Sequence, residues 1–446
     1  MEHILAIDLG AQRIKAAVAC KDENGELEIL GLGTADTDGF ANGYVQDMEA
    51  LSNKIYSALL ELQKDWQDDI NPFKMPIFYS VSGEHLSSRN IETEMRLVSN
   101  IDPETKEGKI SQEDIDTQKR ELETFASDVL PKGMRKIGII LQCYQVDKKL
   151  GIKNPKEMHG RDIRAAGLLI TDAQSHIFDL ENAIIKALMI DFGNIEKKDL
   201  QLIPVAASIA SATAVLSKEQ NENGVAILDI GRGCCDLSVF YKEKPVFIWS
   251  KDYAGEEITM EIKKFLTISY DEAESIKKEY AYASPVKAGQ KESIEISEGR
   301  VIALDSLAQW VYDPIKHMFG DANNSLDGNI DRTTYKKIIS QVVLTGGTAN
   351  LKEIAFVAQE VFGLPVKTGK PNAVKINGNY SNIQKDMSFA TLIGLCAYGI
   401  KNYVSCETAV SGRKKTYNTR KIKNVDNKVG NFVKEWWEAF KNIKFK

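Results

Sequence analysis

ILAIDLGAQRIKAAVA, residues 4–19, has a second copy in AILDIGRGCCDLSVF, residues 226–240. Each copy is an apolar run, then Asp-x-Gly, then a few small or polar residues, then a second apolar run. This order predicts a strand, a tight turn and a strand. Asp8 holds the same place in the first copy as Asp229 in the second. Helical patterns follow both copies, so the sequence predicts two α/β halves built alike.

Length and composition limit the class of protein. A chain of 446 residues exceeds the size at which one core keeps growing, so we expect at least two domains. A net charge of −6 argues against general nucleic-acid binding. The six cysteines form no CxxC pair and the five histidines no HxxxH spacing, so we expect neither a zinc site nor a disulfide framework. No run of about 18 apolar residues occurs, so we expect a protein of a reducing cytoplasm, neither secreted nor membrane-spanning.

The segment from about 84 to 166 breaks the βα rhythm and is interpreted as an inserted subdomain. Its helix SQEDIDTQKRELETFASDVL begins at Ser111, with Asp114 three residues later, a spacing that resembles a capping box. Between the two halves, LIPVAASIASATAVL at 202–216 is rich in small residues. A helix packed tightly between two domains and an ordinary Ala-rich core helix are both compatible with it.

A third glycine motif follows the two hairpins. QVVLTGGTANLKEI, residues 341–354, is an apolar strand that leads through Gly346 and Gly347 into a helix. Hairpin turns offer backbone N–H groups to phosphate oxygens, their Asp residues suit a hydrated Mg²⁺, and a Gly-Gly turn lets a base and ribose approach the backbone. Each motif alone also fits an ordinary turn. In this order, the three predict an actin-like nucleotide site.

With further motifs, the sequence resembles the FtsA family of actin-like bacterial cell-division proteins over nearly the whole chain. GIKNP at 151–155, followed by MHGRDIRAAGLLIT, resembles a signature at the end of the inserted subdomain. DEAESIK at 271–277 resembles the adenosine-side helix, and DMSFATLIGL at 386–395 the last core helix. The resemblance implies an α/β, actin-like fold, a duplicated ribonuclease-H-like architecture with two lobes around a nucleotide cleft, an inserted FtsA-type subdomain and a C-terminal amphipathic helix.

The resemblance also divides the chain into parts. It implies subdomain IA at 1–83 and 167–200, the inserted subdomain IC at 84–166, subdomain IIA at 201–255 and 336–400, subdomain IIB at 256–335, a flexible linker at 401–430 and a membrane-targeting helix at 431–446.

ATP and Mg²⁺ are the cofactors that the resemblance implies. Residues near the β- and γ-phosphates would be Gly10, Ala11, Gln12, Arg13 and Lys15, and the second phosphate loop would hold Gly231, Arg232, Gly233 and Cys234. Glu274, Lys277 and Lys278 would lie beside the adenosine, opposite Gly346 and Gly347. Asp8 and Asp229 would lie near the metal. For Lys278, a solvated helix face is the alternative.

Three residues depart from the family pattern. The family usually has Thr or Ser at Ala11, Gly at Arg232 and Thr at Cys234, and each lost hydroxyl removes a hydrogen bond worth roughly 1 kcal/mol. Arg232 either supplies a cation at the phosphates or crowds them. Cys234 and Cys235 either replace other side chains or respond to oxidation. Residues 203–206 offer no Gln or Glu to orient water, so we expect nucleotide binding with at most slow hydrolysis and assign no catalytic residue.

The chain ends in NFVKEWWEAFKNIKFK, residues 431–446. On a helix, one face would be apolar and the other charged. Paired tryptophans, flanking lysines and a preceding polar segment favour a helix that lies in the membrane headgroup plane; docking on its own body is the alternative. The membrane-binding residues would be Phe432, Val433, Trp436, Trp437, Phe440 and Ile443, with Lys434, Lys441 and Lys444. One such helix is a modest anchor to anionic lipids, and many on one filament would act together.

The resemblance implies several partners, and the net charge already argues against nucleic acid as one of them. They are the C-terminal tail of the tubulin-like protein FtsZ, other divisome proteins and further copies of this chain in an actin-like filament, on the cytoplasmic face of the cell membrane at the division site. Arg300 and Lys316 are the candidates to bind the FtsZ tail. A PilM-like pilus-assembly scaffold and a sugar-kinase-type phosphotransferase are the alternatives, and GIKNP and the Trp-bearing tail favour FtsA over both.

Overall fold

The computed structural model describes residues 3–66, 71, 74–288, 292–296, 299–329, 338–377 and 379–406. Two large β-sheets and two large hydrophobic clusters organise this part of the chain, and the first cluster also includes residues of the second sheet, such as Val225 and Ile227. The predicted α/β class is confirmed, and the two Asp-x-Gly copies each form a strand–turn–strand hairpin.

The six-stranded sheet of the first lobe has the order β14-β6-β1-β2-β3-β22. β1 and β2 are the first hairpin, and β6 and β14 run parallel to β1 on its other side. The strands are β1 (Ile4–Leu9), β2 (Arg13–Lys21), β3 (Leu27–Asp36), β6 (Ile77–Val81), β14 (Leu202–Ala206) and β22 (Ile376–Asn377). A two-stranded ribbon of β4 (Phe40–Ala41) and β5 (Tyr44–Val45) follows β3.

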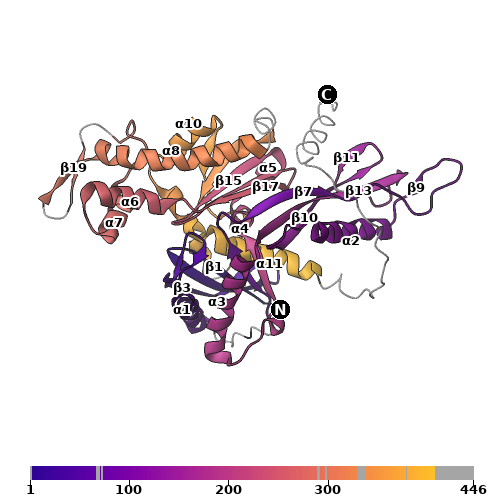
Figure 1. The fold of residues 1–446 in the computed structure, drawn as a ribbon, viewed down its shortest axis with the longest axis horizontal. Helices are drawn as coiled ribbons and strands as arrows, with labels where there is room; N and C mark the ends of the chain where they lie inside the picture. Colours follow the sequence, from indigo (N-terminus) through magenta and orange to yellow (C-terminus); the bar gives the residue numbers. More distant parts are fainter. Residues whose placement is uncertain are drawn as a thin grey trace.

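Four helices contribute buried residues to the hydrophobic core around this sheet. α1 (Met48–Asp65) contacts β3 and α3 (Gln174–Phe192), while α11 (Ala390–Cys406) lies against β1 and along α4 (Ala207–Val215). In Figure 1, α4 and α11 occupy the middle of the molecule, between the two sheets. α4 and α11 approach closely because both carry small residues: a Cβ on Gly394 would lie 1.8 Å from the carbonyl oxygen of Ala210.

The second lobe contains the second hairpin. It consists of β15 (Val225–Ile230) and β16 (Cys235–Tyr241), continued by β17 (Lys244–Lys251), with β20 (Gln341–Thr345) and β21 (Val366–Thr368) parallel to β15. Its helices are α5 (Lys218–Asn223), α6 (Gly255–Leu266), α7 (Tyr270–Tyr280), α8 (Leu304–Asn329) and α10 (Ile354–Phe362). A small hairpin of β18 (Ser293–Glu295) and β19 (Val301–Ala303) precedes α8.

An insertion extends the second lobe's sheet. It contains β7 (Ser87–Glu92), β8 (Arg96–Leu97), β9 (Gly108–Lys109), α2 (Gln112–Asp128), β10 (Met134–Val146), β11 (Lys149–Ile152), β12 (His159–Gly160) and β13 (Asp162–Ala173). The expected capping box is confirmed: Ser111 and Asp114 each bond the other's backbone N–H. β7 meets β17 with one backbone pair and with hydrogen bonds from Ser88 and Asn90, which makes one continuous ten-stranded sheet (Figure 1).

Two expectations about segments need correction. Residues 202–206, expected to begin a helix, form strand β14 because they pair in parallel with β6. Residues 401–406, expected to begin a linker, continue α11, since no Gly or Pro between 401 and 406 ends the helix. The rest of the expected linker and the helix at 431–446 lie outside the described residues. Among the described helices, none is both long and apolar enough to cross a membrane.

Candidate functional site

A pocket of about 390 Å³ lies where the two hairpin turns and the end of β20 meet. Its size is typical of small-molecule sites. Both lobes line it, and so do all of the residues that we expected near phosphate, metal or adenosine. They are Asp8, Gly10, Ala11, Gln12, Arg13, Lys15, Asp229, Gly231, Arg232, Gly233, Cys234, Glu274, Lys277, Lys278, Gly346 and Gly347. The structure therefore brings three distant sequence motifs to one place.

The first hairpin brings a buried ion pair to the pocket. Asp8 and Lys15 are opposite each other across β1 and β2, and Lys15 Nζ lies 2.8 Å from Asp8 Oδ2. Ser80 at the end of β6 donates to Asp8 Oδ1 at 3.1 Å. At the turn, a Cβ on Gly10 would lie 2.6 Å from the carbonyl oxygen of Arg13, so the tight turn requires glycine.

The second hairpin has a carboxylate where the first has Lys15. In the strand register, Asp236 lies opposite Asp229, as Lys15 lies opposite Asp8 in the first hairpin. Burial raises the pKa of Asp229 to about 6, and the nearby Asp8 adds to the effect against a 2.6 Å hydrogen bond from Thr391. Burial likewise raises the pKa of Asp236 to about 7. The pocket floor therefore holds more negative charge than Lys15 alone neutralises.

These groups are compatible with Mg²⁺. Carboxylate and hydroxyl oxygens are the ligands this hard cation prefers, and it usually keeps several waters and bonds to one or two carboxylates and to substrate phosphates. Burial is the main cause of the raised pKa of Asp229 and the charge of Asp8 adds to it, so a cation beside the two carboxylates would favour their charged forms. Within the described ranges, no three His, Cys, Asp or Glu side chains converge as direct metal ligands. Asp8 and Asp229 would thus hold the ion with help from water and ligand oxygens.

The turn after β20 depends on Gly346. Its backbone has φ 89° and ψ 169°, a conformation that is essentially restricted to glycine. A Cβ there would lie 2.4 Å from Asp229 Oδ1 and 2.6 Å from the carbonyl oxygen of Ile230. At Gly347 the nearest atom to an added Cβ is 3.9 Å away, on Ser388. Gly346 therefore permits close packing on β15, whereas Gly347 leaves open space at the pocket wall.

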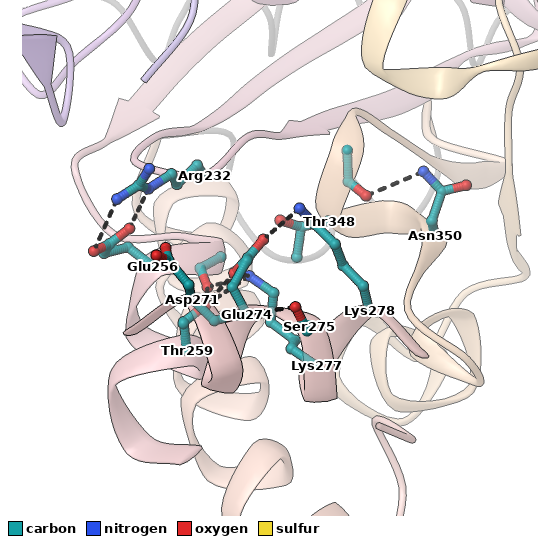
Figure 2. Close-up of polar contacts among 12 residues, drawn as sticks. Arg232, Glu256, Thr259, Asp271, Glu274, Ser275, Lys277, Lys278, Thr348 and Asn350 are labelled. Carbon is teal, nitrogen blue, oxygen red and sulfur yellow. Dashed lines mark hydrogen bonds and ion pairs between the residues drawn. The ribbon is translucent and has the colours of Figure 1, made fainter. Parts of the chain in front are cut away.

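Helix α7 contributes a polar cluster to the opposite wall (Figure 2). Glu274 pairs with Lys277 at 2.7 Å and with Lys278 at 3.1 Å, and it accepts from Thr259 at 2.6 Å. Lys277 is buried and also donates to the carbonyl oxygen of Gly255 at 2.9 Å. Lys278 is 52% exposed in its side chain yet still lines the pocket. The cluster joins the start of α6 to the pocket face of α7.

Arg232 is bound to the same two helices. Its guanidinium pairs with Glu256 on α6 (Figure 2). Its Cζ lies 4.8 Å from the ring centre of Tyr270, the first residue of α7. Tyr270 donates its hydroxyl hydrogen to Glu256 at 2.7 Å. The side chain is therefore held at the border between the hairpin turn and α7.

The paired cysteines are buried. Burial raises the pKa of Cys234 and of Cys235 well above the usual range of a thiol, with nearby carboxylates such as Asp236 adding to it. Both therefore remain neutral thiols at physiological pH, which disfavours reaction with oxidants because the thiolate is the reactive form. Burial therefore favours the interpretation that the two cysteines replace other small side chains over the one in which they respond to oxidation.

Sequence reasoning missed several pocket residues. The most informative are Asp236, Thr348 and Thr391. Aligning the two hairpins as far as Lys15 would have identified Asp236. Thr348 donates to the carbonyl oxygen of Gly231 at 2.7 Å, a contact between segments over 100 residues apart that no local pattern signals.

The two candidates for partner binding lie outside this pocket. Arg300 donates from Nη1 to the carbonyl oxygen of Leu266 at 2.7 Å, so it is tied to the end of α6. Lys316 is exposed on α8, and its Nζ lies 5.3 Å from the ring centre of Tyr312. Ile315, which precedes it, is fully buried.

The fold and the cleft define an actin-like protein. Over 89% of this chain and 98% of that one, the structure is similar to a PilM–PilN type IV pilus biogenesis complex, with a TM-score of 0.56 and 15% identity. It is also similar to MreB5 of Spiroplasma citri bound to ADP, with a TM-score of 0.51 and 13% identity over 92% and 99% of the two chains.

Sequence comparison identifies the family. The model of "Cell division protein FtsA" matches residues 226–394, and that of the "SHS2 domain inserted in FTSA" matches residues 83–171. The FtsA protein of Pseudomonas aeruginosa is 25% identical to this chain over 89% of both chains. The FtsA protein of Escherichia coli is 26% identical over 92% of this chain and 93% of its own length. The FtsA of Borreliella burgdorferi is 27% identical over 97% and 99%. The chain belongs to the FtsA family of cell-division proteins.

Proposed function

We propose that this chain is a nucleotide-binding cytoskeletal adaptor of bacterial cell division that polymerises and tethers FtsZ filaments to the cytoplasmic membrane. The observation that carries the proposal is the meeting of both glycine hairpins, the Gly346 turn and the α7 cluster around one pocket, in a member of the FtsA family. Family membership favours this function over the pilus-assembly scaffold and the sugar kinase.

ATP with Mg²⁺ is the proposed ligand, and a structurally similar MreB5 is bound to ADP. The turns at Gly10 and Gly231 would present backbone N–H groups to phosphate oxygens, because no side chain blocks the approach there. Lys15 would add a cation, and Glu274 and Lys277 would hydrogen-bond the nucleoside side. Mg²⁺ at Asp8 and Asp229 would neutralise phosphate charge.

Hydrolysis is expected to be slow. In actin-superfamily ATPases, a side chain near the junction that corresponds to β14–α4 commonly orients the attacking water. Here the β14–α4 junction presents the aliphatic residues Val205, Ala206 and Ala207, and Ala207 lines the pocket. Without a polar side chain there, water lacks a positioning partner. Isothermal titration with ATP and Mg²⁺ should give one site per chain, while phosphate release stays far below one turnover per second. A turnover rate typical of metabolic kinases, roughly 10 per second, would refute the slow-hydrolysis part.

The FtsZ tail is proposed to bind where α6 and α8 meet. Phe265 and Trp310 stack there at 4.9 Å with an interplanar angle of 7°, and Phe265 is half exposed. Arg300 and the exposed Val301 lie beside the end of α6, and Lys316 lies further along α8. An apolar surface with two cations suits a peptide that carries apolar and acidic side chains.

Binding of an FtsZ tail peptide tests this surface. Phe265→Ala should weaken binding at least tenfold, in the range of an aromatic hot spot. Lys316→Ala should weaken it severalfold and more at low salt, because an exposed charge acts mainly over long range. Lys64→Ala, which removes a cation from α1 in the other lobe, is the control. Equal binding by all three variants would refute the location.

Membrane attachment is proposed for the segment 431–446 on its sequence pattern alone. Several tails on one polymer would bind far more tightly than one, without any new contact. The site of action would be the cytoplasmic face of the cell membrane at the division site, together with other divisome proteins.

A further inference from the structure

Arg232, a lining residue of the pocket, has one nitrogen without a hydrogen bond in the described part of the chain while the rest of its guanidinium is fixed. Nε and Nη2 both face the carboxylate of Glu256, with Nη2 3.5 Å from Oε1 (Figure 2). Tyr270 covers the guanidinium at 4.8 Å from its ring centre. Nη1, which carries two N–H donors, makes no hydrogen bond to any residue in the described ranges. Arg232 lines the pocket with its side chain 33% exposed.

The backbone fixes this arrangement further. Glu256 N donates to the carbonyl oxygen of Arg232 at 2.7 Å, and Gly255 N donates to that of Gly231 at 3.2 Å. Glu256 also accepts from Tyr270 at 2.7 Å. The hairpin turn, the start of α6 and the start of α7 are therefore tied together around one guanidinium. A side chain held in this way loses little conformational entropy when it binds a ligand.

The charges around the pocket distinguish Arg232 from its neighbours. Lys15 and Lys277 are each paired with a carboxylate that itself lines the pocket, so their charge is offset where a ligand would lie. Glu256, the partner of Arg232, is not part of the lining. Arg13 also has an outside partner, but its side chain is 56% exposed and its ion pair is longer, at 3.5 Å. Arg13 and Arg232 are thus the lining cations whose partner carboxylates lie outside the lining, and Arg232 is the more firmly held of the two.

We propose that Arg232 donates from Nη1 to a phosphate group of the bound nucleotide, with Glu256 and Tyr270 as positioning residues. An arginine has a planar fork of donors that suits phosphate oxygens. In this chain, it would replace donors that a hydroxyl side chain at Ala11 or Cys234 would have supplied. This inference rests on the nucleotide binding proposed above.

The test compares ATP with adenosine, which lacks phosphate. Isothermal titration of the full chain with each ligand would be run for the wild type and for R232A, at low and at high salt. R232A should bind ATP roughly 10- to 100-fold more weakly, the range of one hydrogen bond between charged groups, and its ATP affinity should depend less on salt. Its affinity for adenosine should stay within about twofold of the wild type. K264A removes a cation that does not line the pocket and should match the wild type for both ligands.

Further variants separate contact from support. R232K keeps the charge but cannot reach Glu256 and a phosphate together, so we expect an intermediate loss of ATP affinity; this variant decides the question if R232A does not fold. Y270F keeps the ring and removes the hydrogen bond to Glu256, and a loss of a fewfold confined to ATP is expected. Unchanged ATP affinity in R232A and R232K would overturn the phosphate contact, and so would equal losses for ATP and adenosine. If the wild type bound neither ligand, the proposed function would fail as well.

Discussion

Gly346 and Gly347 are adjacent, yet replacing Gly346 by alanine should destabilise the protein far more than replacing Gly347. At Gly346, the backbone conformation costs a non-glycine residue about 1–3 kcal/mol. The added Cβ would also lie 2.4 Å from Asp229 Oδ1 and 2.6 Å from the Ile230 carbonyl oxygen, and overpacking of this kind costs about 1–3 kcal/mol. G346A should therefore lower the local free energy of unfolding by about 2–6 kcal/mol. G347A, with no atom closer than 3.9 Å to its Cβ, should change it by less than about 1 kcal/mol.

Native-state hydrogen exchange measures this difference where it arises. A chain of several domains does not unfold in two states, so a global midpoint would blur the effect. Amides of β15 and β20 should exchange at least tenfold faster in G346A, because each 1.4 kcal/mol corresponds to a factor of ten. In G347A their rates should stay close to those of the wild type. Equal protection of these strands in the two variants would show that neither the backbone conformation nor the contact with Asp229 constrains the turn.

Three further substitutions test buried polar groups. Burial lowers the pKa of His176, but hydrogen bonds to Asp172 and Gly43 outweigh this effect and raise the pKa. The stabilisation of the fold by this histidine should therefore be complete below about pH 6.5 and fade at higher pH. Hydrogen exchange of the amides in the β4–β5 ribbon should lose that pH dependence in H176Q. Burial raises the pKa of Asp236 to about 7, so local stability should fall as pH rises from about 4 to 7. The protection of β16 amides against hydrogen exchange should depend less on pH in D236N. Glu181 is buried, and one of its carboxylate oxygens lies 2.7 Å from Arg135 on β10. E181Q should lower the free energy of local opening of β10, measured by hydrogen exchange, by about 1–3 kcal/mol. Unchanged protection of β10 would show that this ion pair does not stabilise the strand.

Local patterns predicted the parts of the fold that depend on neighbours in sequence. The two hairpins were predictable because apolar runs flank an Asp-x-Gly turn. The helix after Ser111 was predictable because the residues of its capping box, Ser111 and Asp114, are only three positions apart. Strand β14 was not predictable in the same way. Its residues 202–206 resemble the helix that follows, and only the pairing with β6, more than 120 residues earlier, makes them a strand.

The candidate site shows the same division. Glycines and acids of the turns could be chosen from motifs, because their roles depend on local backbone geometry. The position of Arg232 could not, since it depends on Glu256 and Tyr270, 24 and 38 residues away. Asp236 lay within reach of sequence reasoning, because the strict register of a hairpin places it opposite Asp229.

The most direct test of the adaptor function is co-sedimentation of FtsZ with anionic liposomes. The full chain would be compared with a chain truncated after Lys428, each with and without ATP and Mg²⁺. We expect FtsZ to sediment only with the full chain and ATP and Mg²⁺ to increase the amount, because a polymer engages many tails at once. Equal recruitment of FtsZ by the truncated chain, or none by either, would contradict it.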